Sequence, residues 1–118
     1  MRTSEAADVY ARALFELATL AGSVDATDES MASVVKAVRG SVDLRDALTS
    51  TGVPVEKKRD VLREIFGEAV TPEALAVTTS IVERGQLDIL DQVAAAYRET
   101  AEKERGIAVV DVTTAVPL

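Results

Sequence analysis

Apolar residues recur along most of this chain at intervals of three and four, which is the spacing of one face of an α-helix. The N-terminal segment shows this pattern most clearly, and its apolar face is Ala6, Val9, Tyr10, Ala13, Leu14, Leu17 and Ala21. A second apolar set, which is Ala7, Ala11, Phe15 and Ala18, widens that face. The pattern predicts a first helix over residues 4–21 that ends at Gly22.

Five further segments have the same period and are bounded by glycines, prolines or polar capping residues, the usual signals of helix ends. They cover about residues 25–40, 42–48, 54–66, 71–84 and 87–105. We therefore expect an all-α fold, a compact six-helix bundle over residues 1–105, in which the first and last helices are longest. The side chains expected in its core are Leu14, Phe15, Leu17, Val35, Leu62, Ile65, Phe66, Ile81, Leu90, Val93 and Tyr97.

The pattern changes after Gly106, which is expected to end the last helix. Residues 107–115 are rich in β-branched side chains and partly alternate, which favours a β-strand. A single strand is not stable alone, because its backbone groups need a neighbouring strand. We therefore expect residues 106–118 to form a strand-like linker to a C-terminal domain absent from this chain, and to be poorly ordered or paired with another molecule.

Composition narrows the possible functions. The chain has 118 residues, a net charge of −7, and neither cysteine nor histidine. Nucleic-acid binding needs clustered Lys and Arg, so the acidic balance argues against it. Histidine is the commonest general base and the commonest metal ligand, and cysteine would be needed for thiol chemistry or a zinc-thiolate site. The glycines are spread out as helix ends instead of forming a phosphate loop. The sequence therefore predicts no catalytic, cofactor-binding or metal site, and Asp43 and Asp46 are interpreted as a solvated helix face.

The apolar arc of the first helix is wide for a single packing contact. Two explanations stay open at this point. The helix is either central and packed on several sides, or it leaves one edge free as a groove for a partner helix.

Three segments together resemble one family, the delta subunits of F-type ATP synthases, whose mitochondrial relative is the oligomycin-sensitivity-conferring protein. The run Tyr10–Ala18 is similar to the opening of those subunits. Val53–Phe66 is similar to their proline-led fourth helix, and Val110–Leu118 to the step into their second domain. The sequence departs from the family pattern in the fifth helix and the turn after it, where it has Ala76-Val77-Thr78 and Gly85-Gln86-Leu87.

The resemblance implies a non-catalytic stator subunit that helps to couple proton transport to ATP synthesis. It implies that this N-terminal domain binds the amphipathic N-terminal helix of an alpha subunit between its first and fifth helices. The b subunits of the peripheral stalk would bind only through the absent C-terminal domain, and the protein would lie peripherally on the cytoplasmic face of the bacterial plasma membrane. The partner groove expected from this is Val9, Tyr10, Ala13, Leu17, Val77, Ser80, Ile81 and Arg84.

Two other functions remain possible from the sequence. One is a helical adaptor or regulatory bundle unrelated to ATP synthase, and the other is a small helical enzyme or an accessory fragment of one. An enzyme would require an ionisable group with a perturbed pKa in a concave pocket.

Overall fold

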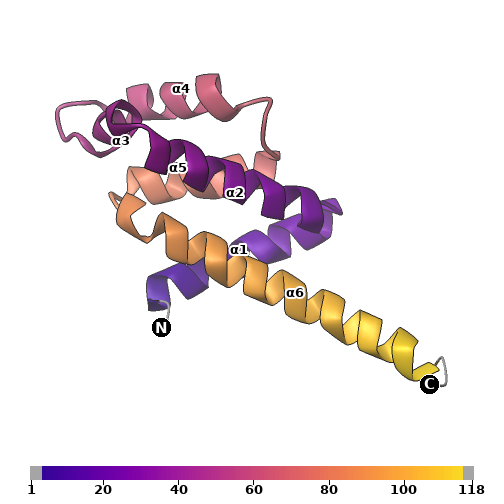
Figure 1. Cartoon of the computed structure of the whole chain (residues 1–118). Coiled ribbons are helices and arrows are strands. Elements are labelled where there is room, and N and C mark those ends of the chain that lie inside the picture. The colour runs from indigo at the N-terminus through magenta and orange to yellow at the C-terminus, as the bar shows by residue number, and fades with distance from the viewer. Residues whose placement is uncertain (1–3, 116–118) are drawn as a thin grey trace.

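The structure, a computed structural model, describes the backbone of residues 4–115 and the side chains of residues 4–105. The helices of this part are α1 (Glu5–Ala21), α2 (Val24–Gly40), α3 (Val42–Thr49), α4 (Val55–Phe66), α5 (Pro72–Glu83) and α6 (Leu90–Ala115), and the short 3-10 helix η1 (Leu87–Ile89) precedes α6 (Figure 1). No β-strand occurs in residues 4–115. The predicted all-α fold of six helices is therefore confirmed, with α2 as long as α1.

Local capping signals explain where the helices begin and end. The Ser4 side-chain oxygen accepts a hydrogen bond of 3.0 Å from the Ala7 amide at the start of α1. Thr71 does the same for the Ala74 amide at the start of α5, at 3.2 Å. Gly22 and Gly85 adopt φ angles of 69° and 68°, a conformation that favours glycine, so each turns the chain sharply at a helix end.

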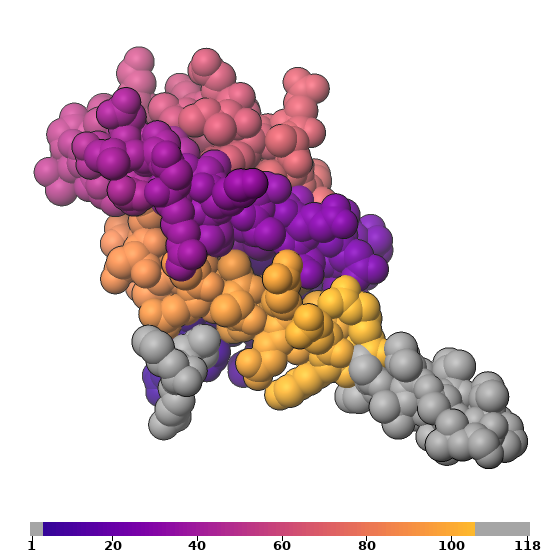
Figure 2. All heavy atoms as spheres, viewed as in Figure 1, coloured from indigo at the N-terminus to yellow at the C-terminus, as the bar shows by residue number. Residues whose placement is uncertain are grey.

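The bundle is arranged around α1. This helix packs against α6, α2 and α5, while α4 covers α5 and α3 follows α2. The face of α1 that enters the core is Ala7, Ala11, Leu14 and Ala18. Because the distance between packed helices depends on the side chains at the contact, the three alanines let the neighbouring helices approach closely. Figure 2 shows the face of the molecule on which α2 and α6 lie side by side.

The core is largely the predicted one. Of the residues expected there, Leu14, Leu62, Phe66, Ile81, Leu90, Val93 and Tyr97 are buried, and Phe15 and Val35 are half-buried against them. Leu17 and Ile65 were predicted wrongly, because they are 42% and 48% exposed. In each case a neighbouring side chain points into the core instead. The buried neighbours of Leu17 on α1 are Leu14 and Ala18, and the buried neighbour of Ile65 on α4 is Phe66.

Polar side chains inside the bundle are paired. Thr78 is fully buried, and its hydroxyl lies 3.9 Å from the Met31 sulfur. The hydroxyls of Thr27 and Thr71 lie 2.8 Å apart, and the Ser30 hydroxyl accepts a hydrogen bond of 2.9 Å from the Thr71 amide. No buried side-chain nitrogen or oxygen among the described side chains lacks a hydrogen-bond partner. The polar composition of α5 is therefore compatible with a packed interior.

The C-terminal end of α6 differs from the sequence prediction. The helix continues without a break through Gly106 to Ala115, so the strand expected from Ile107 is not found, and the helix does not end at Gly106. Strand preference depends on having a neighbour to pair with, and residues 4–115 offer none. A helix instead satisfies its backbone groups within the segment.

Figure 1 shows this end of α6 extending past the rest of the bundle. The side chains of residues 106–115, and residues 116–118, lie outside the described part, and the predicted domain boundary after Arg105 stays a prediction.

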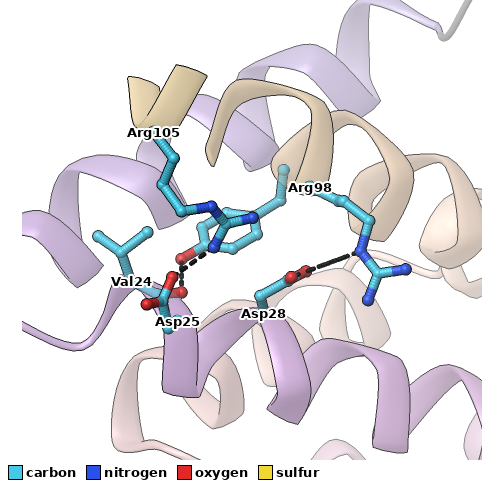
Figure 3. A network of polar contacts seen from close by, with 6 residues as sticks. Val24, Asp25, Asp28, Arg98 and Arg105 are labelled. Carbon is cyan, nitrogen blue, oxygen red and sulfur yellow. Dashed lines mark hydrogen bonds and ion pairs between the residues drawn. The ribbon is translucent and has the colours of Figure 1, made fainter. Parts of the chain in front are cut away.

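A polar network ties the start of α2 to α6 (Figure 3). The Tyr97 hydroxyl donates a hydrogen bond of 2.6 Å to the Val24 carbonyl oxygen. Arg98 pairs with Asp28 at 3.2 Å, and Arg105 pairs with Asp25. Burial, together with the negative charge of Asp28, raises the pKa of Tyr97 to about 12, so the phenol stays neutral and remains a hydrogen-bond donor at neutral pH.

Candidate protein-binding surface

The most unusual surface of the described part is a row of apolar side chains on α1. Val9, Leu17 and Leu20 are 63%, 42% and 86% exposed, and Ala13 between them is also exposed. These four residues, which we call the α1 stripe, are spaced by four, four and three positions, so they share one helix face. A single exposed leucine needs no explanation, but an aligned row of four apolar residues indicates a surface that another molecule covers.

The α1 stripe borders the end of α5. Tyr10 lies between the stripe and the core, is half-buried, and donates a hydrogen bond of 2.6 Å from its hydroxyl to the Gln86 side-chain oxygen. Gln86 belongs to the turn that joins α5 to η1. The structure therefore brings α1 and the end of α5 together.

The predicted groove residues divide into two groups. Val9, Ala13 and Leu17 on α1, and Ser80 and Arg84 on or next to α5, are exposed and accessible to a partner, and Tyr10 is partly accessible. Val77 and Ile81 are instead 6% and 0% exposed and belong to the core. They do not line an open surface, because α5 turns its apolar side chains toward the bundle and its small and charged ones outward.

The exposed face of α5 continues toward α4. A hollow of about 310 Å³ lies between these helices and is lined by Arg59, Arg63, Ala76 and Ser80 among others. Arg59 pairs with Glu83 at 2.6 Å, whereas Arg63 is exposed, with Asp60 at 3.7 Å. Ser80 lines this hollow and is also a residue of the predicted partner groove, so the hollow adjoins the predicted groove.

The sequence pattern did not identify Leu20 as part of this surface, and it did not show which apolar side chains of α1 are buried. Leu20 was not among the predicted groove residues, although it follows Leu17 by three positions. The four-residue set Ala7, Ala11, Phe15 and Ala18 was treated as secondary, yet its alanines form the buried face of α1. The sequence signal for this buried face was the regular spacing of the small residues Ala7, Ala11 and Ala18, which is typical of close helix packing.

Within residues 4–105, no group of three or more acidic side chains is placed to hold a metal ion. None of the helices in the described part is long and apolar enough to pass through a membrane. What these residues offer is an apolar row with small neighbours and charged edges, which suits an amphipathic helix.

Comparisons with known proteins decide the family. Residues 6–118 match the family described as ATP synthase delta (OSCP) subunit. The chain belongs to this family. The match removes the alternative of an adaptor unrelated to ATP synthase, and it confirms the resemblance seen in the sequence.

Individual members of the family agree with this assignment. The chain is 32% identical to the chloroplastic ATP synthase subunit delta of Ochrosphaera neapolitana, over 100% of this chain and 66% of the relative. It is 34% identical to ATP synthase subunit delta of Synechococcus elongatus, over 98% of this chain and 64% of the relative. For the subunit of Christiangramia forsetii the identity is 36%, over 100% of this chain and 64% of the relative. The chain thus spans just under two thirds of the length of these relatives.

Proposed function

We propose that this chain is the part of a non-catalytic ATP synthase stator subunit that binds the amphipathic N-terminal helix of an alpha subunit at the top of the catalytic head. The observation that carries the proposal is the exposed α1 stripe beside the end of α5, in a chain that belongs to the delta family. A stator has to bind tightly and resist the torque of the rotor. Such a role needs an adhesive surface on a rigid bundle and no reacting groups.

The α1 stripe has the right chemistry for such a helix. Complete burial of an exposed leucine or valine stabilises a complex by roughly 1.5–3 kcal/mol, so three of them supply much of the energy of a specific contact. Ala13 lies at the centre of the stripe and lets the partner backbone come close. Ser80, also small, lies on α5 nearby. The partner would place its own large apolar residues at positions i, i+3, i+4 and i+7 over these small ones.

The test is a binding titration of the cognate alpha-subunit N-terminal peptide against the chain and its Ala13→Glu variant. Because Ala13 is exposed, the variant is expected to fold as the wild type does, which circular dichroism and thermal unfolding check. We expect binding at least tenfold weaker, about 1.4 kcal/mol, since the substitution places a charge in an apolar contact. The matched control is Ala95→Glu, the same substitution at an exposed position of α6.

The proposal fails if Ala13→Glu binds the peptide as tightly as wild type, or if Ala95→Glu weakens binding equally. Salt supplies a further check. Because apolar burial would dominate, raising the salt concentration from 0.05 to 0.5 M should change the affinity only slightly.

The remaining partners follow from the same proposal. The b subunits would bind through the part of the relatives' length that this chain does not span, so residues 1–118 alone should not bind them. The protein would be held peripherally at the cytoplasmic face of the plasma membrane by the complex. Strong binding of a b subunit to this chain would contradict that division of roles.

A further inference from the structure

A second hollow lies on a different part of the bundle and is larger than the one beside α5. It is the groove between α2 and α6, which has a volume of about 760 Å³. Its apolar floor is formed by Ala32 and Val35 of α2 and by Ala94 and Ala95 of α6. No residue of α1 or α5 lines it, so it is separate from the α1 stripe. Figure 2 views the face on which α2 and α6 meet.

Two ion pairs cross the α2–α6 groove. Asp28 pairs with Arg98 at 3.2 Å toward one end, and Arg39 pairs with Asp91 toward the other. This pairing shows that α2 and α6 run antiparallel. Arg39 follows Asp28 by eleven positions, which is a rise of about 16 Å along the helix, or three turns. The groove is therefore long enough for three turns of a third helix.

The charges on the rim are separated along the length of the groove. Lys36 lies on the rim near Arg39 and makes no ion pair with any described side chain. Glu99 and Glu102 line the opposite end. Glu102 makes no ion pair within the described residues, and Glu99 has only the exposed Lys103 at 3.7 Å. One end thus carries an unpaired positive charge and the other a negative excess.

We propose that the α2–α6 groove binds an amphipathic helix of another polypeptide, with acidic residues in its first turn beside Lys36 and basic residues in its last turn beside Glu99 and Glu102. The helix would run antiparallel to α2. Its large apolar side chains would fill the space that Ala32, Ala94 and Ala95 leave open. Acidic residues at the start and basic residues at the end also stabilise an isolated helix through its dipole, so this charge pattern favours the partner before it binds.

A second copy of the chain does not fit this role. Two copies related by a two-fold axis would present one hollow to another, and neither hollow fills the other. If the α1 stripe of one copy entered the α2–α6 groove of the next, the first and last copies would each keep one free binding surface. Such head-to-tail contacts would build a filament. Moreover, α1 has no basic residue in its last turn to place beside Glu99 and Glu102.

The probes are two 14-residue peptides with the same composition and the same leucine stripe at i, i+3, i+7 and i+10. One has glutamates in its first turn and lysines in its last turn. The other has glutamate and lysine mixed at both ends. Calorimetric titration against the 118-residue chain should show three- to tenfold tighter binding of the first peptide at low salt, with the difference lost at high salt because the rim charges are exposed. Equal affinities, or no binding of either peptide at millimolar concentration, would overturn the proposal.

Two substitutions locate the site. Ala95→Glu places a charge on the groove floor and should weaken binding of the first peptide at least tenfold. The matched control, Ala13→Glu on the α1 stripe, should leave that binding unchanged, and both variants should unfold at the wild-type temperature. Equal weakening by both would show that the peptide binds elsewhere. Self-association of the wild-type chain that Ala95→Glu abolishes would show that a second copy, and not another polypeptide, fills the groove.

Orientation is tested separately with a nitroxide label at the N-terminus of the first peptide. In the proposed complex the label should broaden the amide signals of residues 36–40 and spare those of residues 99–103. The reverse pattern would show that the partner runs parallel to α2, against the proposal. The Lys36→Glu variant should remove the preference between the two peptides while leaving the fold intact, because Lys36 is exposed.

Discussion

The hydroxyl of Tyr10 donates a hydrogen bond of 2.6 Å to the side-chain oxygen of Gln86, although the two residues are 76 positions apart in the sequence. This contact joins the proposed binding face of α1 to the turn after α5. The amide oxygen of Gln86 can accept this hydrogen bond, whereas an arginine at position 86 could not, because a guanidinium has no acceptor atom.

We expect Tyr10→Phe to lower the free energy of unfolding by about 1 kcal/mol, since a partly buried hydrogen bond contributes about that much. Gln86→Ala should cost a similar amount. The double variant should cost less than the sum, with a coupling of about 0.5–1.5 kcal/mol if the two side chains bond directly. Urea unfolding of the four proteins measures this, and strictly additive losses would mean that the hydrogen bond contributes nothing.

The raised pKa of Tyr97 predicts a loss of stability at high pH. Below pH 10 the phenol is neutral in both the folded and the unfolded chain, so its stabilising contribution is fully present. Between pH 10 and about 12 the unfolded chain releases the proton while the folded chain keeps it, so the stability falls as pH rises. The total loss should be roughly 2–3 kcal/mol, from about 1.4 kcal/mol per unit of pKa.

Tyr97→Phe is the control for this titration. The variant should be less stable at pH 7, because the Val24 carbonyl loses its donor, but its stability should decline less steeply above pH 10. Thermal unfolding across pH 8–12 compares the two proteins. The same slope in both would show that other groups, such as lysines, cause the whole decline.

Residues that share one apolar pattern but differ in burial should differ in how much their truncation lowers the free energy of unfolding. Leu62→Ala and Leu90→Ala remove fully packed side chains and should each cost about 2–5 kcal/mol of unfolding free energy. Ile65→Ala, three positions from Leu62 on the same helix, should cost less than about 1 kcal/mol because Ile65 is 48% exposed. Comparable losses at Leu62 and Ile65 in urea unfolding would mean that α4 is rotated about its axis.

Substitutions of Gly106, followed by circular dichroism, test whether α6 continues as a helix through this residue. Gly106→Ala should raise the helix signal at 222 nm and stabilise the segment by up to about 1 kcal/mol, because alanine is the better helix former. Gly106→Pro should lower the signal, since proline removes a helical hydrogen bond and clashes with the preceding turn. If both variants leave the spectrum unchanged, residues 106–115 are not helical in solution.

Much of this fold was predictable because its signals are local. Ser4 caps α1 through an amide three residues away, Thr71 does the same for α5, and Gly22 turns the chain where a left-handed conformation is needed. Such interactions depend on near neighbours alone, so the order and approximate limits of the first five helices could be found without the structure. The sequence of the first helix, the proline-led fourth helix and the C-terminal segment also indicated the family, which the comparisons confirmed.

Which face of each helix enters the core was decided only by the tertiary structure. On α1 two apolar sets compete: the smaller residues Ala7, Ala11 and Ala18 are buried, while the larger Val9 and Leu17 stay exposed. Hydrophobicity alone favours the opposite choice. The alanine face enters the core because α1 is surrounded by α2, α5 and α6 and must pack closely against all of them.

The end of α6 also depends on neighbours in space, since a segment rich in β-branched residues but without a neighbouring strand satisfies its backbone within a helix. The amino-acid sequence determined where the first five helices form, because that depends on neighbours along the chain. The tertiary structure determined what the helices bury, because that depends on neighbours in space.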